Sequence, residues 1–376
     1  MTHEYDVVIA GAGPAGSAAA AVLAGRGLSV AVLDRREFPR NKLCGGLLTW
    51  KTRQILERVF GPGVLDGATD HVSDRYEIFH RDRLLAEGRS PEPFVLVKRR
   101  ILDLRLLELA RARGAAFFPN RAVAECRPER GELATAGGEV FRGRYVIGAD
   151  GAGSVVRKRL GADREAWRKG LAGAVEILVP REALPGAVDH PRLYAGFVDT
   201  GYGWVFPNSD GMVVGLCGLM RGKPDYPRLL RDFLGFHGLL GMRGVAVYGH
   251  PLPYGNYLKT PYGGRALLAG DAGGFVEPLL GEGIFYALTT GRYAAEAVIE
   301  ALDRGGEPGP AYARRIRRVL VPEFRAANAL RWTLFALLRG AGPGLMGGAV
   351  RLFSGPLVQA VHGLRSYRFL LPKTWG

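Results

Sequence analysis

The sequence predicts an α/β fold (α+β overall) in which a nucleotide-binding domain is interleaved with an antiparallel sheet domain and followed by a helical, basic C-terminal segment. Three observations support this expectation. A glycine-rich turn, GAGPAG, occupies residues 11–16, and a second glycine-rich loop runs over residues 270–284. Between them, residues 170–257 alternate apolar and polar side chains and contain many turn formers. One dinucleotide is therefore expected to be bound from both ends of the chain.

Composition sets the limits of the prediction. With 376 residues, of which 47% are hydrophobic, the chain has enough apolar material for two interleaved domains. Its three cysteines, Cys44, Cys126 and Cys217, form no CxxC pair, so neither a disulfide framework nor a metal site is expected. This cysteine usage fits a reducing, cytoplasmic compartment.

The N-terminal segment predicts a strand, a turn, a helix and a second strand. Tyr5 to Ala10 is a short apolar run that suits a buried parallel strand. Pro14 to Gly25 is an alanine-rich helix, and Leu28 to Leu33 is the next strand, which ends at Asp34. This order is the βαβ beginning of a Rossmann-like domain.

The later elements continue this pattern of buried strands and helices and are interrupted by an antiparallel region. In order, they are a helix over Lys98–Arg113, a strand over Tyr145–Gly148, the antiparallel region Gly170–Tyr257, a strand over Ala266–Ala269 and a helix from Gly283 to Leu302. We therefore expect a discontinuous nucleotide-binding domain (1–70, 98–165 and 260–305), a substrate-binding sheet domain (71–97 and 166–259) and a C-terminal helical segment (311–376).

The first glycine motif has a direct physical interpretation. Gly11 permits a tight turn, Gly13 lets the backbone approach a pyrophosphate, and Gly16 allows close packing of helix on strand. The amides at the start of the helix then face the phosphates.

Asp34 stands at the end of the second strand, where a carboxylate accepts hydrogen bonds from ribose hydroxyls. Arg35 and Arg36 follow it, and arginine at this place also suits a 2′-phosphate. Because Asp34 would repel that phosphate, we expect an unphosphorylated adenosine ribose.

Further motifs resemble the FAD signatures of the para-hydroxybenzoate-hydroxylase-like flavoproteins over nearly the whole chain. They are Arg99 with Asp103, Asp150-Gly151 with Ser154 and Arg157, and Gly270-Asp271 with Pro278 and Gly281. The resemblance implies that Asp271 binds the ribityl chain and that Arg99 reaches the polar middle of FAD. The residues assigned to FAD are Gly11, Gly13, Pro14, Ala15, Gly16, Asp34, Arg35, Cys44, Gly45, Gly46, Arg99, Val123, Asp150, Gly151, Gly270, Asp271, Pro278, Gly281, Gly283 and Ile284.

Two segments resemble the geranylgeranyl reductase family within that superfamily. Residues 39–47, PRNKLCGGL, are similar to its lysine-cysteine-glycine loop, and residues 202–207, YGWVFP, match its YxWxFP segment. In this family, a GxG sequence normally follows the YxWxFP segment. Here it reads Gly215-Leu216-Cys217, so a cysteine replaces the second glycine. Glu277 also stands where a smaller polar residue is commoner.

This resemblance implies reduction of a prenyl double bond by reduced flavin. Cys44, Tyr202 and Trp204 are the candidate catalytic residues, and Phe206 and Pro207 would complete an apolar substrate groove. Ordinary packing is the competing interpretation for Phe206 and for Cys44. The sequence does not assign the proton donor. It also contains no second GxGxxG motif in a strand–helix context, so no dedicated nicotinamide domain is expected, and the reductant is NAD(P)H, a ferredoxin or another donor.

Two other functions fit the same fold. A flavin monooxygenase or halogenase would use oxygen, although the WxWxIP segment of halogenases is missing. A membrane-docked carrier would pass electrons from flavin to a quinone or partner protein and leave lipids unchanged.

The net charge of +15 is concentrated in the C-terminal segment. Residues 311–376 contain eleven lysines and arginines and one acid, Glu323, among many apolar residues. Such a segment either lies on an anionic membrane at the inner face of the cell membrane or packs as a helical cap on the body. It would suit a prenyl lipid or prenyl diphosphate substrate, and no motif for nucleic acid accompanies it.

Overall fold

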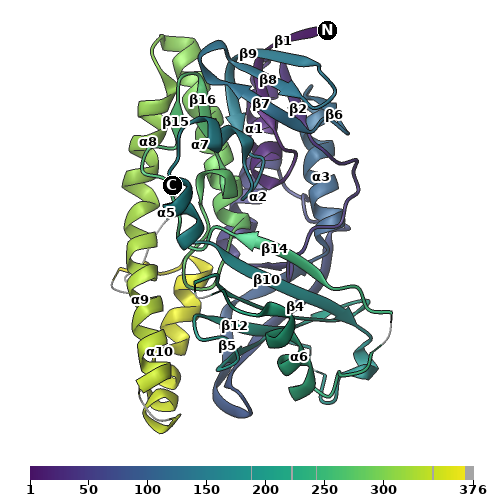
Figure 1. Cartoon of the computed structure of the whole chain (residues 1–376), viewed down its shortest axis with the longest axis vertical. Coiled ribbons are helices and arrows are strands. Elements are labelled where there is room, and N and C mark those ends of the chain that lie inside the picture. The colour runs from purple at the N-terminus through teal and green to yellow at the C-terminus, as the bar shows by residue number, and fades with distance from the viewer. Residues whose placement is uncertain (188, 222, 243, 341–342, 369–376) are drawn as a thin grey trace.

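The computed structural model describes residues 1–187, 189–221, 223–242, 244–340 and 343–368. The α/β class is confirmed: two sheets lie toward opposite ends of the long axis, and helices pack around them (Figure 1). Of the predicted C-terminal segment, residues 341–342 and 369–376 lie outside the described residues.

The first sheet is built around buried parallel strands. Four neighbouring strand pairs, from β16 to β6, are parallel, and β7 and β8 add an antiparallel extension to β9. Its members are β15 (Tyr262–Gly263), β16 (Ala266–Leu268), β9 (Val140–Gly148), β1 (Thr2–Ala10), β2 (Val30–Leu33), β6 (Ala116–Phe118), β7 (Val123–Arg127) and β8 (Glu132–Thr135). The fully apolar sequence VAVL of β2 follows from burial on both faces.

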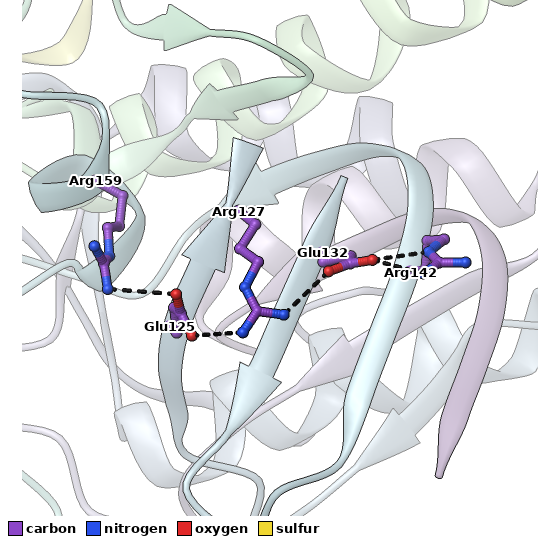
Figure 2. Close-up of polar contacts among 5 residues, drawn as sticks. All are labelled: Glu125, Arg127, Glu132, Arg142 and Arg159. Atoms are coloured by element: carbon purple, nitrogen blue, oxygen red, sulfur yellow. Dashed lines mark hydrogen bonds and ion pairs between the residues drawn. The ribbon is translucent and has the colours of Figure 1, made fainter. Parts of the chain in front are cut away.

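An ion-pair ladder crosses the antiparallel extension of this sheet (Figure 2). Glu125 lies 3.5 Å from Arg159 of helix α4 (Val155–Arg159) and 3.0 Å from Arg127. Glu132 lies 3.3 Å from Arg127 and 2.7 Å from Arg142. Because the three arginines are about half exposed, solvent screens these pairs and each contributes little to stability. The ladder therefore serves mainly to tie α4 to the strands.

One face of this sheet is covered by α1 (Pro14–Ala24), α3 (Arg99–Ala112) and α7 (Ile284–Arg304). The approach of α1 to α7 is very close, because a Cβ on Gly291 of α7 would overlap the carbonyl oxygen of Ala15. The alanines of α1 that face this contact are fully buried. Small side chains therefore allow two helices from opposite ends of the chain to touch.

The second sheet is mostly antiparallel, as the alternating sequence predicts. In spatial order it comprises β14 (Tyr248–Leu252), β10 (Ala172–Val179), β13 (Gly211–Leu219), β12 (Gly201–Asn208), β11 (Arg192–Ala195), β4 (Thr69–His80), β5 (Arg83–Val97) and β3 (Leu47–Leu48). Helix α6 (Tyr226–Phe236) covers one face through Leu230 and Phe233. The other face carries Trp204 and Phe206.

The C-terminal helices run along the side of the molecule past both sheets (Figure 1). They are α8 (Pro308–Val319), α9 (Val321–Gly340) and α10 (Pro343–His362), and the shorter helices α2 (Trp50–Phe60) and α5 (Arg164–Lys169) complete the fold. Ile316, Phe324 and Ala327 are fully buried, so much of this segment packs on the body. Leu352 and Phe353 of α10 are 71% and 56% exposed. Within the described ranges, no helix is both long and apolar enough to cross a membrane.

A buried histidine links α10 to the body and makes stability depend on pH. His362 accepts a hydrogen bond from the Trp50 amide at 3.0 Å and packs on Phe94. Burial, assisted by Lys51 and Arg53, lowers the pKa of His362 from 6.5 to about 3. Below about pH 6.5, the histidine of the unfolded chain therefore binds a proton, whereas His362 of the folded chain stays neutral. The free energy of unfolding falls as pH decreases from there toward 3.

We expect His362→Gln to make the free energy of unfolding less dependent on pH between 6.5 and 4, because this difference in protonation is removed. Urea denaturation followed by tryptophan fluorescence at a series of pH values measures the slope. Equal slopes in the variant and the parent protein would contradict the assignment.

Candidate functional site

The first glycine turn has the geometry of a phosphate-binding loop. Gly11 has a φ of +97°, and a Cβ there would overlap the carbonyl oxygen of Ala149. Gly16 is equally restricted, because its Cβ would overlap the carbonyl oxygen of Gly11. A Cβ on Gly13 would meet only Arg40 Nη2, at 3.7 Å. Since no described side chain caps α1, the amides at its start are available to an anion.

Asp34 ends β2 beside this turn. Its carboxylate accepts hydrogen bonds from the amides of Ala12 and Arg36, both at 2.9 Å. Each oxygen keeps a further lone pair, so a ribose hydroxyl can still bind. The Arg121 amide donates to the Asp34 carbonyl at 2.8 Å, which brings the segment leading to Val123 close by. Arg35 is exposed.

Two guanidinium groups share one buried carboxylate near the same turn. Arg99 contacts Asp103 through two hydrogen bonds of 2.8 and 2.9 Å, and Arg40 lies 3.3 Å from it. Burial opposes the charge of Arg99, but Asp103 and Cys44 outweigh it and raise the pKa of Arg99. Because one carboxylate faces two arginines, a positive charge is left over beside Gly13, where a pyrophosphate is expected.

The second glycine loop lies against the first. Gly270 begins a 3-10 turn (Gly270–Gly273), and a Cβ on it would lie 3.0 Å from that of Ala15. Asp271 Oδ1 lies 3.7 Å from the Cβ position of Gly283, which precedes α7. Burial raises the pKa of Asp271, and the positive charges of Lys42 and Arg99 partly oppose this. Like α1, α7 begins without a capping side chain from the described residues.

The turn that joins these residues to α7 is fixed by a buried carboxylate. Glu277 accepts hydrogen bonds from the amides of Leu279 and Leu280 at 2.7 and 2.6 Å. Burial raises the pKa of Glu277 to about 7, although both amides favour the charged form. The larger acid that departs from the family pattern is therefore used to hold the turn.

Side chains from three distant segments brace the same turn. Tyr202 donates to the Leu280 carbonyl, and Tyr254 donates to the Leu279 carbonyl. From α9, Arg331 donates to the carbonyls of Pro278 and Tyr254, both at 3.0 Å. Tyr202 is thus placed as a positioning residue, with its hydroxyl already engaged.

Asp150 and its neighbours hold helix α4 against the second glycine loop, and Asp150 Oδ1 is buried without a hydrogen-bond partner among the described residues. Asp150 accepts from the Val155 amide at 2.6 Å, and Ser154 caps the same short helix by accepting from the amide of Arg157. The guanidinium of Arg157 lies 3.6 Å from the ring centroid of Trp167 and donates to the Ala272 carbonyl at 3.5 Å. This motif therefore connects α4 to the turn that carries Asp271.

The cysteine loop (residues 39–47) packs on the face of the second sheet that carries Trp204 and Phe206. The Cys44 amide donates to Glu176 Oε1 at 2.9 Å, and the Gly46 amide donates to Cys44 Sγ at 3.4 Å. A Cβ on Gly45 would lie 2.6 Å from the Phe206 ring, so only glycine fits without a shift. The loop thereby joins the cofactor-facing segments to the second sheet.

Tyr202, Trp204 and Phe206 lie on one face of β12, and their successive ring centroids are 6.0 and 6.5 Å apart. Pro207 follows Phe206 and, by strand alternation, faces the side covered by α6. Cys217, which replaces a family glycine, pairs with Tyr202 in register, and burial raises the pKa of its thiol to about 12. The substituted position is therefore filled by an inert apolar group.

Several residues of this site were not predicted. Glu176 had a signal, because it is the one charge in the otherwise apolar strand AGAVEILV. Lys42 lies in the cysteine loop, where burial lowers its pKa and Asp271 partly restores it. Tyr254 and Arg331 had no recognisable signal, since their roles depend on contacts between distant segments.

The uncapped helix starts, the room above Gly13 and the buried Asp271 fit an extended dinucleotide, and the site defines a flavoprotein that binds FAD. Residues 4–201 match the family model of the FAD binding domain. The menaquinone reductase of Mycolicibacterium smegmatis is 34% identical over 79% of this chain and 76% of the relative. The chain belongs to the geranylgeranyl reductase family of FAD-dependent oxidoreductases.

Other comparisons agree with this family. The chloroplastic geranylgeranyl diphosphate reductase of Arabidopsis thaliana is 29% identical over 81% of this chain and 67% of the relative. A geranylgeranyl bacteriochlorophyll reductase-like protein from Thermoplasma acidophilum has the same fold, with a TM-score of 0.79, 20% identity and 98% of each chain covered.

We expect Gly13→Ala to weaken FAD binding at least tenfold while leaving the stability of the apoprotein unchanged. Gly13 has an ordinary φ of −72° and space for a Cβ, but that methyl group would stand where the pyrophosphate approaches. Flavin fluorescence titration measures affinity, and thermal unfolding of the apoprotein measures stability.

Gly137→Ala is the matched control, because that exposed glycine meets only Thr135 Oγ1 at 3.8 Å. Unchanged FAD affinity in Gly13→Ala would show that the turn serves packing alone.

Proposed function

We propose that this enzyme saturates carbon–carbon double bonds of a prenyl chain of the geranylgeranyl type. The observation that carries the proposal is the aromatic face of β12, which the cysteine loop joins to the FAD-binding segments. Trp204 and Phe206 are 6% and 9% exposed and would bury an isoprenoid away from water. The names of the plant relatives, which refer to geranylgeranyl diphosphate, support this substrate class.

The chain's own residues would divide the work. FAD, when reduced, supplies hydride. The FAD would be held by Asp271, Arg99 and the starts of α1 and α7. Tyr202 would keep the turn at Leu280 in place. The π faces of Trp204 and Phe206 would stabilise positive charge that develops on the alkene. We propose that the electrons come from a donor that docks transiently, either NAD(P)H or a ferredoxin.

A second candidate is reduction of a quinone ring, which the name of the mycobacterial relative favours. A menaquinone carries both a reducible ring and a prenyl side chain, so one substrate distinguishes the two reactions. Ring reduction is reversed by air, whereas a saturated side chain keeps its two extra hydrogens.

We expect dithionite-reduced enzyme, incubated without oxygen with prenyl diphosphates, prenyl lipids and a menaquinone, to yield products that keep a two-hydrogen mass gain after exposure to air. Trp204→Ala should lower the yield at least tenfold, and Trp204→Phe should retain most of it, because the apolar π surface is kept. Recovery of every substrate without the mass gain, from enzyme whose flavin is still reoxidised by menaquinone, would favour quinone reduction instead.

We also propose that the enzyme lies on the inner face of the cell membrane through the middle of α10. Leu352 and Phe353 project there beside Arg351, which combines insertable apolar side chains with a charge that attracts anionic lipids. The rest of the C-terminal segment would then support this contact from the body.

We expect the double variant Leu352→Ser and Phe353→Ser to bind vesicles of phosphatidylglycerol and phosphatidylcholine at least fivefold more weakly than the parent protein, since its apolar insertion is lost. Co-sedimentation measures the bound fraction. Leu240→Ser, a change at a residue that is 62% exposed beside α6, is the control and should bind normally. Equal binding by all three proteins would contradict this contact.

A further inference from the structure

A buried carboxylate, Glu176, stands on the aromatic face of the second sheet. Glu176 lies in the middle of β10 and is only 7% exposed. Its neighbours Val175 and Ile177 point to the face covered by α6, whereas Ala174, two residues away, shares the face with Trp204. A buried acid without a full set of partners is costly, so its place in this strand calls for a chemical reason.

The register of the sheet puts Glu176 in the same row as Trp204. Glu176 pairs with Gly215 on β13, and Gly215 pairs with Trp204 on β12. Because Gly215 has no side chain, the indole leans across it, and a Cβ there would lie 2.6 Å from Trp204 Cε2. Glu176 Oε2 and Trp204 Nε1 are both buried, and neither has a hydrogen-bond partner among the described residues. Two unsatisfied polar atoms thus accompany the predicted substrate surface.

The cysteine loop determines which oxygen of Glu176 is free. Oε1 accepts the Cys44 amide at 2.9 Å, so a proton on the carboxyl belongs on Oε2. The same loop places Gly45 against Phe206. The acid is therefore held by the segment that also closes over the aromatic row.

The surroundings keep a large fraction of this carboxyl protonated near pH 7. Burial raises the pKa of Glu176 to about 7, while the Cys44 amide and the positive charges of Lys42 and Arg99 oppose the rise. From β14, Tyr248 stands opposite Glu176, and His250 stands opposite Ala174, two pairs along the strand. Burial lowers the pKa of His250 to about 4, so it is neutral at pH 7.

We propose that Glu176 is the acid that protonates the prenyl double bond, an inference that rests on the proposed function. One alkene carbon receives hydride from reduced FAD, and its neighbour receives the proton from Oε2. The π bond breaks, two C–H bonds form, and the flavin is oxidised by two electrons. Glu176 is left as a carboxylate and takes a new proton from water.

Two other groups are candidate acids, and the Tyr202 hydroxyl fits less well than Glu176. The Tyr202 hydroxyl already donates to the Leu280 carbonyl, and burial raises its pKa well above the usual value. The Cys44 thiol accepts the Gly46 amide, which leaves its S–H group able to donate a proton. Cys44→Ala therefore serves as the competing variant.

The decisive variant is Glu176→Gln, which keeps an oxygen for the Cys44 amide but loses the acidic proton. We expect reoxidation of its reduced flavin by a prenyl substrate to slow at least a hundredfold, with FAD affinity and reduction by dithionite unchanged. The parent rate should fall as pH rises through about 7, because the acid deprotonates, and the residual rate of the variant should be flat.

A measurement without cofactor tests the same group. Infrared difference spectra of the apoprotein should show protonated carboxyl bands from Glu176 and Glu277 that disappear as pH rises through about 7, and Glu176→Gln should remove the Glu176 band while the Glu277 band stays. Glu176→Asp should keep the band and recover part of the rate. These readouts separate proton donation from mere positioning of the loop.

Each other outcome overturns the inference. A Glu176→Gln enzyme with the parent rate and pH profile, or one that loses FAD affinity in proportion to activity, removes the role of proton donor. A hundredfold loss in Cys44→Ala with a normal Glu176→Gln assigns the proton to Cys44. Parent enzyme that reduces no prenyl substrate overturns the proposed function together with this inference.

Discussion

The close contact between α1 and α7 is the constraint on which the site depends. A glycine and an alanine, Gly291 and Ala15, let the two helices approach until backbone meets backbone, and Gly270 adds a second contact with Ala15. The starts of both helices therefore open onto the same space. The family resemblance predicts that both helix starts contact FAD, so a larger residue at either contact would be expected to separate the two halves of that site.

Charge in this site is balanced in small buried groups. Asp103 serves both Arg99 and Arg40, while Lys42 lies near Asp271. The pKa of Lys42 is lowered and that of Asp271 is raised because burial is only partly compensated. A bound dinucleotide, with its two phosphate charges and its hydroxyls, supplies the missing partners. Protein groups and cofactor therefore stabilise each other electrostatically.

The sequence was sufficient to predict features that depend on only a few neighbouring residues. The glycine turn, Asp34 and the apolar strands follow from chain geometry over a few residues, and the α/β class was confirmed. The sequence was insufficient to predict contacts between segments that lie far apart in the chain. Nothing near Arg331 indicates that it binds the Pro278 carbonyl, and only the sheet register brings Glu176 into line with Trp204. The site residues assigned from family resemblance stay predictions.

The pairing of α1 with α7 also affects how the protein is made. The alanine face of α1 is complete once the first strands have been synthesised, but its covering helix begins only at Ile284. Throughout synthesis of the intervening sheet, this small-residue surface stays open to water on the ribosome. A molecular chaperone that shields α1 during that interval would act before FAD, which meets its complete binding site only when nearly the whole chain has emerged.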